Sequence, residues 1–368
     1  MQDRPLIVGA GPTGLAAALF LAHKGVSPRV IDRAPAPERQ SRALIVNPRT
    51  LDLLEPTGVA DAILAEGHRL RRVCFYENWS PVAELALEPK MRFLVALPQA
   101  RVETLLREAL FARGVEVERG LRFEKLAQDG EGVVATLADA DGARENARAP
   151  LLLGADGAHS RVRDALAIAF EGSSFPEDWP LCDLRLDDPL DPESVHVCFI
   201  RGGLIVMLAL APGLWRAFGN VPDLLYRLPP GTKLGATEWM SSFHIGHRVA
   251  ARETSGRVLL AGDAAHIHSP IGARGMNLGV EDAHVFAECA ADALGGNPSR
   301  LDDYDRLRRD VHRDVVGRMK TLTTFSRGRP NVLGASRPWL IALMTRFPPI
   351  ARVLRDTLTG LDHEVRTR

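Results

Sequence analysis

The chain has 368 residues, of which 46% are hydrophobic, so it is long enough to fold as two domains with a substantial core. Its 46 Lys and Arg balance 46 Asp and Glu, and no basic run is interleaved with aromatic residues, which argues against nucleic acid as a partner. The four cysteines lack C-x-x-C spacing and no apolar run reaches membrane-spanning length, so we expect free thiols, no stable membrane insertion and a cytoplasmic protein.

Residues 5–33 have the order strand, glycine turn, helix, strand and terminal acid. An apolar run at residues 6–8 leads into glycines in G-x-G-x-x-G spacing, an alanine-rich helix follows, and a second strand ends at a carboxylate; these residues are Gly9, Gly11, Gly14 and Asp32. Because all parts of the pattern occur in order, we predict a dinucleotide-binding site. The motif by itself does not distinguish FAD from NAD.

The residue types of this motif fit the binding of a pyrophosphate. Gly9 permits the tight turn out of the strand, Gly11 allows the backbone to approach the pyrophosphate, and Gly14 allows close packing of the helix. The start of the helix offers free N–H groups and the positive end of its dipole. Pro12 suits the first helical turn, where its missing N–H costs little. Asp32 can accept hydrogen bonds from a ribose.

Residues 34–111 predict a loop, short helices and strands. In the loop, Arg39 and Arg42 could reach a cofactor phosphate or ring, or they could belong to a solvated segment. Partial alternation of apolar residues between residues 70 and 97 favours strands, and Pro98 and Gln99 are expected to begin an amphipathic helix that spans Ala100 to Phe111. Gln99 could face a ligand, although an ordinary helix start is the simpler explanation.

A three-stranded meander is predicted for residues 114–150, with its first strand beginning at Val115 and Val117 and with Asp-Gly turns at residues 129–130 and 141–142. An apolar strand then runs into the sequence Gly-Ala-Asp-Gly at residues 154–157. Asp156 is unfavourable as a core residue, so a strand end with an acid between glycines indicates a site. His159 is more simply explained as a solvated residue.

Residues 172–247 are rich in Gly, Pro and Trp and predict a mainly antiparallel sheet, which could enclose a hydrophobic small-molecule cavity or form an ordinary core. The last buried strand, residues 257–261, ends at Gly262 and Asp263, and a second glycine-rich turn then leads into a second helix. Histidine pairs occur at 266/268 and 244/247. No carboxylate or cysteine completes a ligand set nearby in the sequence, so we predict no metal site.

Two further helical segments are expected near the C-terminus. Residues 301–327 form a charged helix, and residues 339–358 carry apolar residues at helical spacing, interrupted at residues 347–349. Packing of the second segment against the sheet or against another subunit is favoured over an interfacial membrane anchor.

Three motifs now stand in one order along the chain: the G-x-G-x-x-G turn with Asp32, residues 154–157, and residues 262–266 with Pro270. Together they resemble the single-component (class A) FAD-dependent aromatic hydroxylases of the para-hydroxybenzoate hydroxylase type. The resemblance covers nearly the whole chain and is weakest at residues 175–246 and after residue 328.

The resemblance implies an α/β fold with a Rossmann-like FAD-binding domain containing a parallel sheet and a β-meander, a mainly antiparallel β-sheet substrate domain, and C-terminal helices. The predicted FAD-binding domain is discontinuous and consists of residues 1–70, 98–174 and 248–330. The substrate domain consists of residues 71–97 and 175–247, and residues 331–368 form the C-terminal helical segment.

The resemblance also implies FAD as the cofactor and NADPH or NADH as the reductant. The cofactor-binding residues that it implies are Gly9, Gly11, Pro12, Thr13, Gly14, Asp32, Arg33, Arg42, Gln99, Asp156, Gly262, Asp263, Pro270, Gly272, Gly275, Met276 and Asn277. Among them, Asp32 would contact the adenosine ribose and Asp263 the ribityl chain, while Pro270 would also shape the substrate pocket. Arg274 stands where many relatives have glutamine, which could change the charge near the active site.

The chemistry implied by the resemblance is hydroxylation of an aromatic, phenolic or polycyclic small molecule with O2 through a C4a-hydroperoxyflavin that is kept from water. A base that activates the substrate would lie in residues 175–246, where His196, Arg216 and Tyr226 are candidates. The alternatives are a flavin-dependent reductase or dehydrogenase acting on an apolar lipid or prenyl substrate, and a flavin-binding protein without enzymatic activity. Either a monomer or a homodimer fits the sequence.

Overall fold

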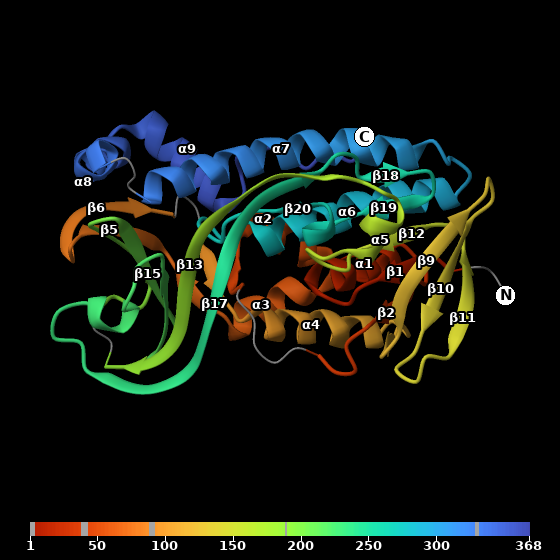
Figure 1. The fold of residues 1–368 in the computed structure, drawn as a ribbon, viewed down its shortest axis with the longest axis horizontal. Helices are drawn as coiled ribbons and strands as arrows, with labels where there is room; N and C mark the ends of the chain where they lie inside the picture. Colours follow the sequence, from red (N-terminus) through yellow and green to blue (C-terminus); the bar gives the residue numbers. More distant parts are fainter. Residues whose placement is uncertain (1–3, 38–42, 88–92, 188–189, 328–330) are drawn as a thin grey trace.

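The computed structural model describes residues 4–37, 43–87, 93–187, 190–327 and 331–368, and Figure 1 shows their arrangement. The half of the molecule that holds the N-terminus contains a parallel sheet between helices and a meander, and the other half contains a large curved sheet. The long helix α7 (Arg300–Arg327) lies along both halves.

The first sheet has six strands in the order β18-β19-β12-β1-β2-β8. All neighbours are parallel except β18 and β19. The strands are β1 (Leu6–Val8), β2 (Arg29–Asp32), β8 (Val117–Arg119), β12 (Leu152–Gly154), β18 (Thr254–Ser255) and β19 (Val258–Leu260). The carboxyl ends of parallel strands meet at one edge of a sheet, so the predicted motifs that follow β1, β12 and β19 lie together there.

Alternating side chains of β1 enter two separate cores. Ile7 packs with helices α1 (Pro12–His23), α4 (Gln99–Phe111) and α6 (Gly275–Leu294) on one face of the sheet. Leu6 and Val8 pack on the other face against the meander, which consists of β9 (Arg122–Gln128), β10 (Val133–Ala138) and β11 (Arg144–Ala149). Burial on both faces explains why the strand reads as a continuous apolar run.

The meander begins later than the sequence analysis predicted. Val117 pairs with Val30 in parallel, so β8 is the edge strand of the parallel sheet and the antiparallel meander starts at Arg122. The prediction that Val115 and Val117 begin the meander is therefore wrong. A three-residue strand next to a hairpin signal gives no local indication of which sheet it will join.

The second large sheet has eight strands in the order β20-β17-β13-β16-β15-β14-β5-β6. It is antiparallel except for the pair β14 and β5, which confirms the prediction of a mainly antiparallel sheet. The strands are β5 (Arg72–Glu77), β6 (Ser80–Ala86), β13 (Phe170–Leu186), β14 (Ser194–Ile200), β15 (Gly203–Ala211), β16 (Leu214–Gly219), β17 (Leu234–Ala250) and β20 (His266–Ile267).

Short elements connect the two halves. A three-stranded sheet of β3 (Ile45–Val46), β7 (Leu94–Ala96) and β4 (His68–Leu70) contributes side chains to the apolar cores of both halves. The remaining short helices are α2 (Pro48–Leu54), η1 (Glu55–Thr57), α3 (Val59–Glu66), α5 (Arg161–Ala165), η2 (Leu224–Arg227) and η3 (Gly262–Ala264). The strands β13 and β17 run through the predicted boundaries near residues 174 and 247 without interruption. The division into domains stays a prediction.

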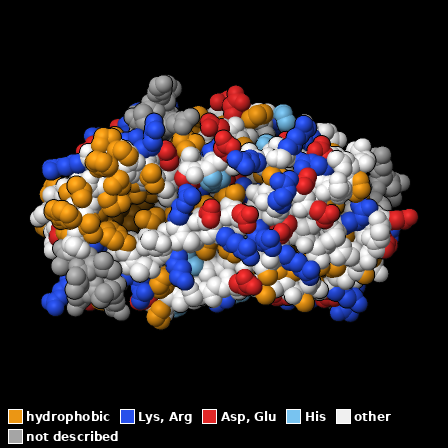
Figure 2. All heavy atoms as spheres, turned by 90° about the horizontal axis from the view of Figure 1, so that it is seen from above, with side chains coloured by type: hydrophobic (Ala, Val, Ile, Leu, Met, Phe, Trp, Pro, Cys, Tyr) orange, Lys and Arg blue, Asp and Glu red, His pale blue; other side chains and the backbone are white. Residues whose placement is uncertain are grey.

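After α7, the chain forms α8 (Asn331–Arg346) and α9 (Pro348–Thr359), which agrees with the predicted interruption near residues 347–349. Buried or partly buried side chains of both helices, including Ile341 and Ala351, pack on the face of the eight-stranded sheet that carries Trp179 and Phe243, which we call its inner face. Their outer face is apolar as well, and Figure 2 shows hydrophobic side chains gathered at this end of the molecule, where Trp339, Leu343, Phe347, Ile350 and Val353 are exposed. Among the described residues, every helix is too short or too polar to cross a bilayer.

Candidate flavin site

The turn between β1 and α1 has the geometry that each predicted glycine requires. Gly9 has a φ of +108°, and a β-carbon there would lie 2.3 Å from the carbonyl oxygen of Ala155. A β-carbon on Gly14 would lie 1.9 Å from the carbonyl oxygen of Gly9, so the helix packs against its own turn. A β-carbon on Gly11 would meet no described atom within 4 Å, so the backbone is open on that side. Two glycines serve the fold and one leaves room for a ligand.

A cavity of about 270 Å³ adjoins this turn. Residues of the first two predicted motifs or their neighbours line part of it, among them Gly9, Gly11, Asp32, Arg33, Asp156 and His159. Arginine side chains at Arg119, Arg122 and Arg161 also reach it. The open backbone at Gly11, the start of α1 and these cations together provide a pocket that suits the phosphates and adenosine of a dinucleotide.

Asp32 ends β2 and holds the turn itself. Its Oδ2 accepts a hydrogen bond from the backbone N–H of Ala10 at 2.7 Å, and its Oδ1 accepts one from the N–H of Ala34, also at 2.7 Å. A carboxylate has about four acceptor positions, so both oxygens retain capacity for ribose hydroxyl groups. Asp32 therefore combines a structural contact with the predicted position at the cavity.

Asp156 follows β12 and binds the start of α5. Its oxygens accept hydrogen bonds from Ser160 Oγ at 2.5 Å and from the backbone N–H groups of Arg161 and Val162 at 2.7 and 3.2 Å. Burial raises the pKa of this carboxyl group, while these hydrogen bonds oppose the rise. The carboxylate thus fixes the loop that lines the cavity next to the first glycine turn.

The start of α6 lies against the start of α1. A β-carbon on Gly279 would lie 2.2 Å from Thr13 Oγ1, and one on Gly262, where φ is +59°, would lie 2.4 Å from the same atom. The first and third motifs therefore meet at Thr13, although they are far apart in the sequence. Two helix N-termini converge at the edge where the parallel strands end.

Asp263 has a solvent-exposed side chain, yet the surrounding protein raises its pKa because it limits the hydration of the carboxylate. Among the described residues it makes no hydrogen bond, in contrast to Asp32 and Asp156. Such a group is suited to accept hydrogen bonds from the hydroxyl groups of a ligand.

The turn before α6 has a left-handed backbone at two successive positions, Gly272 with φ +96° and Ala273 with φ +54°. Ala273 N donates to the carbonyl oxygen of Pro270 at 2.9 Å, which closes the turn. The first backbone N–H to bond back along α6 is that of Leu278, which donates to the carbonyl oxygen of Arg274 at 2.8 Å. The N–H groups of Gly275, Met276 and Asn277 precede it and are available for a negatively charged ligand atom.

The side chains of Asn277 and Gln99 have partners within the protein. Asn277 Oδ1 accepts from Asn47 N and Thr50 Oγ1, and its Nδ2 donates to the carbonyl oxygens of Ile45 and Ala273. Gln99 Nε2 donates to Glu103 Oε1 at 2.8 Å, and Glu103 lines the cavity. Asn277 could thus offer a ligand its backbone N–H but not its side chain. Arg33 is exposed beside the cavity, while Arg39 and Arg42 lie outside the described residues.

Sequence reasoning missed a buried polar cluster behind the third motif. Asp282 of α6 accepts hydrogen bonds from His266 Nε2, His312 Nε2, Arg308 Nε and the backbone N–H of Gly262, at distances of 2.6 to 2.9 Å. Burial opposes its ionisation, but His312, Arg308 and His266 hold the pKa of Asp282 well below its usual value. The cluster fixes the glycine that follows β19.

This cluster corrects the reasoning about metals. A carboxylate does join His266, because His266, Asp282 and His312 place ligand atoms within 4.8 Å of one another. Both histidines are already within hydrogen-bonding distance of Asp282, and Arg308 Nε donates a hydrogen bond to Asp282 Oδ1. A cation beside a guanidinium is unfavourable, so we assign a structural role to this group. Helix periodicity in α6 and α7 could have predicted that Asp282 and His312 each face the interior, but it could not have predicted that they contact each other.

The positions of the three candidate bases do not identify any of them as the base that activates the substrate. His196 is fully buried, with Tyr76 Oη 3.0 Å from its Nδ1 and the carbonyl oxygen of Asp191 2.8 Å from its Nε2. Tyr226 is 88% exposed. Arg216 pairs with Asp183 through two contacts of 2.7 and 2.8 Å and lies over Trp239, on the inner face of the eight-stranded sheet.

The chemistry of these residues fits FAD. The cradle at Gly11 and the cavity beside it suit the adenosine and pyrophosphate, the accessible Asp263 suits the ribityl hydroxyl groups, and the free N–H groups at the start of α6 suit the ring. Ile271, next to Pro270, packs against the apolar cluster of the eight-stranded sheet. Fold and site together define a protein of the FAD-binding class.

Comparison with known proteins agrees with this conclusion. A family profile described as "FAD binding domain" matches residues 4–212 and 229–319. The 6-methylpretetramide 4-monooxygenase of Streptomyces rimosus is 33% identical over 371 residues, which cover 94% of this chain and 66% of that protein. The rifampicin monooxygenase of Streptomyces venezuelae is 30% identical over 377 residues, which cover 97% of this chain and 78% of that protein. The chain therefore spans only about two thirds of the first relative.

Among solved structures, p-nitrophenol 4-monooxygenase from Pseudomonas putida DLL-E4 has a TM-score of 0.88 at 24% identity, with 97% of this chain and 98% of that chain covered. At this identity the likeness concerns the fold. The chain belongs to the FAD-binding family that includes the FAD-dependent aromatic monooxygenases. FAD as the cofactor and the predicted α/β class are thus confirmed, whereas the role of each site residue stays a prediction.

Proposed function

We propose that the protein uses NADPH or NADH and O2 to hydroxylate an aromatic small molecule, phenolic or polycyclic, with FAD bound between its two halves. The observation that carries the proposal is the contact of Thr13 with Gly262 and Gly279, because it joins two helix starts at one edge of the parallel sheet. We also propose that the chain consists of the FAD-binding domain, the substrate domain and the C-terminal segment with the boundaries predicted above. We further propose that the protein is cytoplasmic and that it is a monomer or a homodimer.

The reactivity toward oxygen would come from the cofactor: reduced FAD supplies the electrons with which one atom of O2 is inserted into an electron-rich ring. The chain would bind, orient and shield. The N–H groups at the start of α6 would stabilise negative charge at the ring, as an anion-binding helix terminus does. The apolar inner face of the eight-stranded sheet, with Trp179, Leu208 and Phe243 buried in it, would exclude water.

The substrate class follows from this face and from the names of the relatives. Partly exposed aromatic side chains, Phe218 and Trp239, belong to the same apolar cluster as Ile271, which is next to Pro270. A flat aromatic compound could stack between such groups. The buried pair of Arg216 and Asp183 is a charged feature of this face and could orient a polar substituent. By their names, the relatives act on 6-methylpretetramide and on rifampicin, both larger than a simple phenol.

A library of phenols and polycyclic aromatic compounds, screened for stimulated NAD(P)H consumption by the FAD-loaded protein, tests the proposal. We expect at least one compound to gain one oxygen atom, and the label to appear in the product when 18O2 is supplied. Product formation without label would favour the reductase alternative. NAD(P)H oxidation that no aromatic compound stimulates would favour a binding role without oxygenation.

A further inference from the structure

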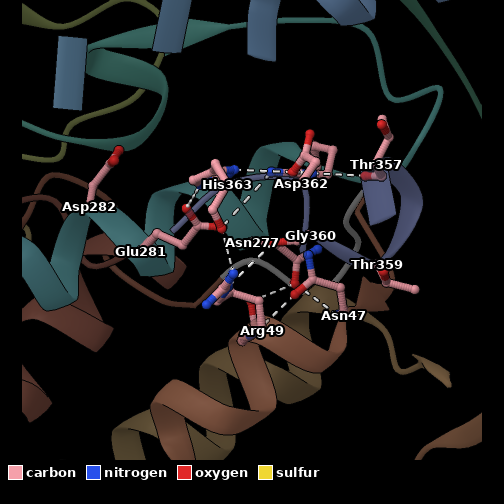
Figure 3. A network of polar contacts seen from close by, with 12 residues as sticks. Asn47, Arg49, Asn277, Glu281, Asp282, Thr357, Thr359, Gly360, Asp362 and His363 are labelled. Atoms are coloured by element: carbon pink, nitrogen blue, oxygen red, sulfur yellow. Dashed lines mark hydrogen bonds and ion pairs between the residues drawn. The ribbon is translucent and has the colours of Figure 1, made fainter. Parts of the chain in front are cut away.

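The residues that follow α9 pack against the elements of the proposed flavin site, and the inference drawn from them rests on that site. Figure 3 shows that residues following α9 lie against the starts of α2 and α6. Arg49 of α2 donates to the carbonyl oxygens of Gly360 and His363 at 3.3 and 2.6 Å. A β-carbon on Gly360, where φ is +78°, would lie 2.4 Å from Asn47 Nδ2. This segment therefore fits tightly onto the elements that carry the flavin-facing turn.

Arg274 connects this segment to the turn. It is the residue directly before α6, and its side chain is fully buried. Its Nη1 donates to the carbonyl oxygen of Thr357 at 2.8 Å and to Asp362 Oδ1 at 2.7 Å. The side chain of Asp362 is 5% exposed, so the pair is almost completely removed from water. A buried guanidinium needs such a partner, because an uncompensated charge in the interior is strongly destabilising.

Other acids near Arg274 are less well placed to balance it. Its Nη2 lies 4.0 Å from Glu281 Oε1, and among the described residues neither atom has a hydrogen-bond partner. Glu281 instead contacts His363 Nε2 at 2.7 Å through its other oxygen. His363 Nδ1 is 3.1 Å from Asp362 Oδ1. Asp362 is thus the carboxylate in direct contact with Arg274, and His363 ties it to α6.

The turn needs an external constraint because its backbone is strained. Ala273 has a left-handed φ of +54°, which an L-residue adopts at a cost of about 1 kcal/mol or more, and it directly precedes Arg274. The Nδ2 of Asn277 holds the carbonyl oxygen of Ala273 from one side at 2.7 Å. The Arg274 side chain holds the next residue from the other side.

We propose that Asp362 is a positioning residue for the flavin site, which acts through Arg274 to hold the turn at residues 270–275 in the conformation that receives the flavin ring. Asp362 does not touch the cofactor in this proposal. Its contribution is to fix the turn before FAD binds, so that less ordering is needed on binding.

The test measures FAD binding, not turnover. In Asp362→Asn, the Kd of the apoprotein for FAD should rise on the order of tenfold, and the visible absorption bands of the bound flavin should shift because the ring environment changes. In the control Arg318→Ala, the exposed partner of Asp362 Oδ2 is removed while the contact with Arg274 remains, so affinity and spectrum should stay as in the wild type.

A second variant separates positioning from folding. Arg274→Met/Asp362→Asn removes both charges of the buried pair together, so its thermal stability should return toward that of the wild type, while FAD affinity and spectrum stay altered. Wild-type FAD affinity in Asp362→Asn, or its recovery together with stability in the double variant, would overturn the proposal. A wild-type protein that binds no FAD would refute the proposed function itself, which is a different result.

Discussion

Thr13 of α1 and Gly279 of α6 are in such close contact that a β-carbon added to Gly279 would lie 2.2 Å from Thr13 Oγ1. Gly279 lies in the first turns of α6, and Thr13 is the second residue of α1. This contact brings the two helix N-termini together, and with them the nucleotide end and the ring end of the proposed FAD site.

We expect Gly279→Ala to lower the free energy of unfolding by about 1–3 kcal/mol, because Thr13 and α6 must move apart. In a Thr13→Ala background the same change should be neutral or stabilising, since the remaining neighbours of the new methyl group are no closer than 3.4 Å and alanine favours the helix. Denaturant unfolding of the four proteins measures this. An equal cost in both backgrounds would show that Thr13 is not the obstacle.

The glycines of the first turn should separate binding from folding. Gly11→Ala places a methyl group where no described atom lies within 4 Å, and the backbone there is extended, with φ −77° and ψ −177°. We expect unchanged apoprotein stability and an FAD Kd raised on the order of tenfold or more. Gly14→Ala should instead destabilise the apoprotein by at least about 2 kcal/mol, because its methyl group would meet Gly9. Unfolding curves and FAD titrations of the two variants should show opposite patterns.

Asp32, the last residue of β2, and Asp263, which follows β19, should differ in the same way. Asp263 makes no hydrogen bond among the described residues and its pKa is raised, so its charge disfavours the folded apoprotein. We expect Asp263→Asn to leave the apoprotein as stable as the wild type or slightly more so, and to weaken FAD binding. Asp32→Ala loses two hydrogen bonds that hold the turn, so it should lower apoprotein stability by about 1–3 kcal/mol. Destabilisation by Asp263→Asn would contradict this distinction.

His312 should make stability depend on pH. Burial lowers its pKa, but the charges of Asp282 and Glu253, each 2.6 Å from a ring nitrogen, raise it to about 9. Arg308 and His266 also face the cluster. Because the folded pKa exceeds the unfolded value of about 6.5, the stabilisation is complete below about pH 6.5 and is lost as the pH rises through about 9.

The size of this effect is on the order of 3 kcal/mol. Unfolding by denaturant between about pH 6 and pH 10 should show a decline in the wild type that is absent in His312→Gln. The exposed His159 offers a control, since His159→Gln should retain the wild-type decline. A wild-type protein whose stability rises over this interval would contradict the assignment.

Much of the site could be predicted because its chemistry is encoded in short stretches. The glycine spacing, the acids Asp32 and Asp156, and Pro12 at the start of α1 each fit a local backbone requirement that the structure shows. The alternation of apolar residues indicated the strands of the second sheet. The first strand of the meander was assigned wrongly because the pairing of β8 with β2 depends on residues far from it in the chain.

The sequence by itself therefore determined the binding unit, the kind of sheet in each half and the class of cofactor, since a turn, a helix start and a strand end are specified by neighbouring residues. Only the tertiary structure decided that Asp282 gathers His266 and His312, and that Arg274 meets a carboxylate 88 residues away. Buried charges must find partners wherever the packed elements bring them, and no local pattern records which distant residue that will be.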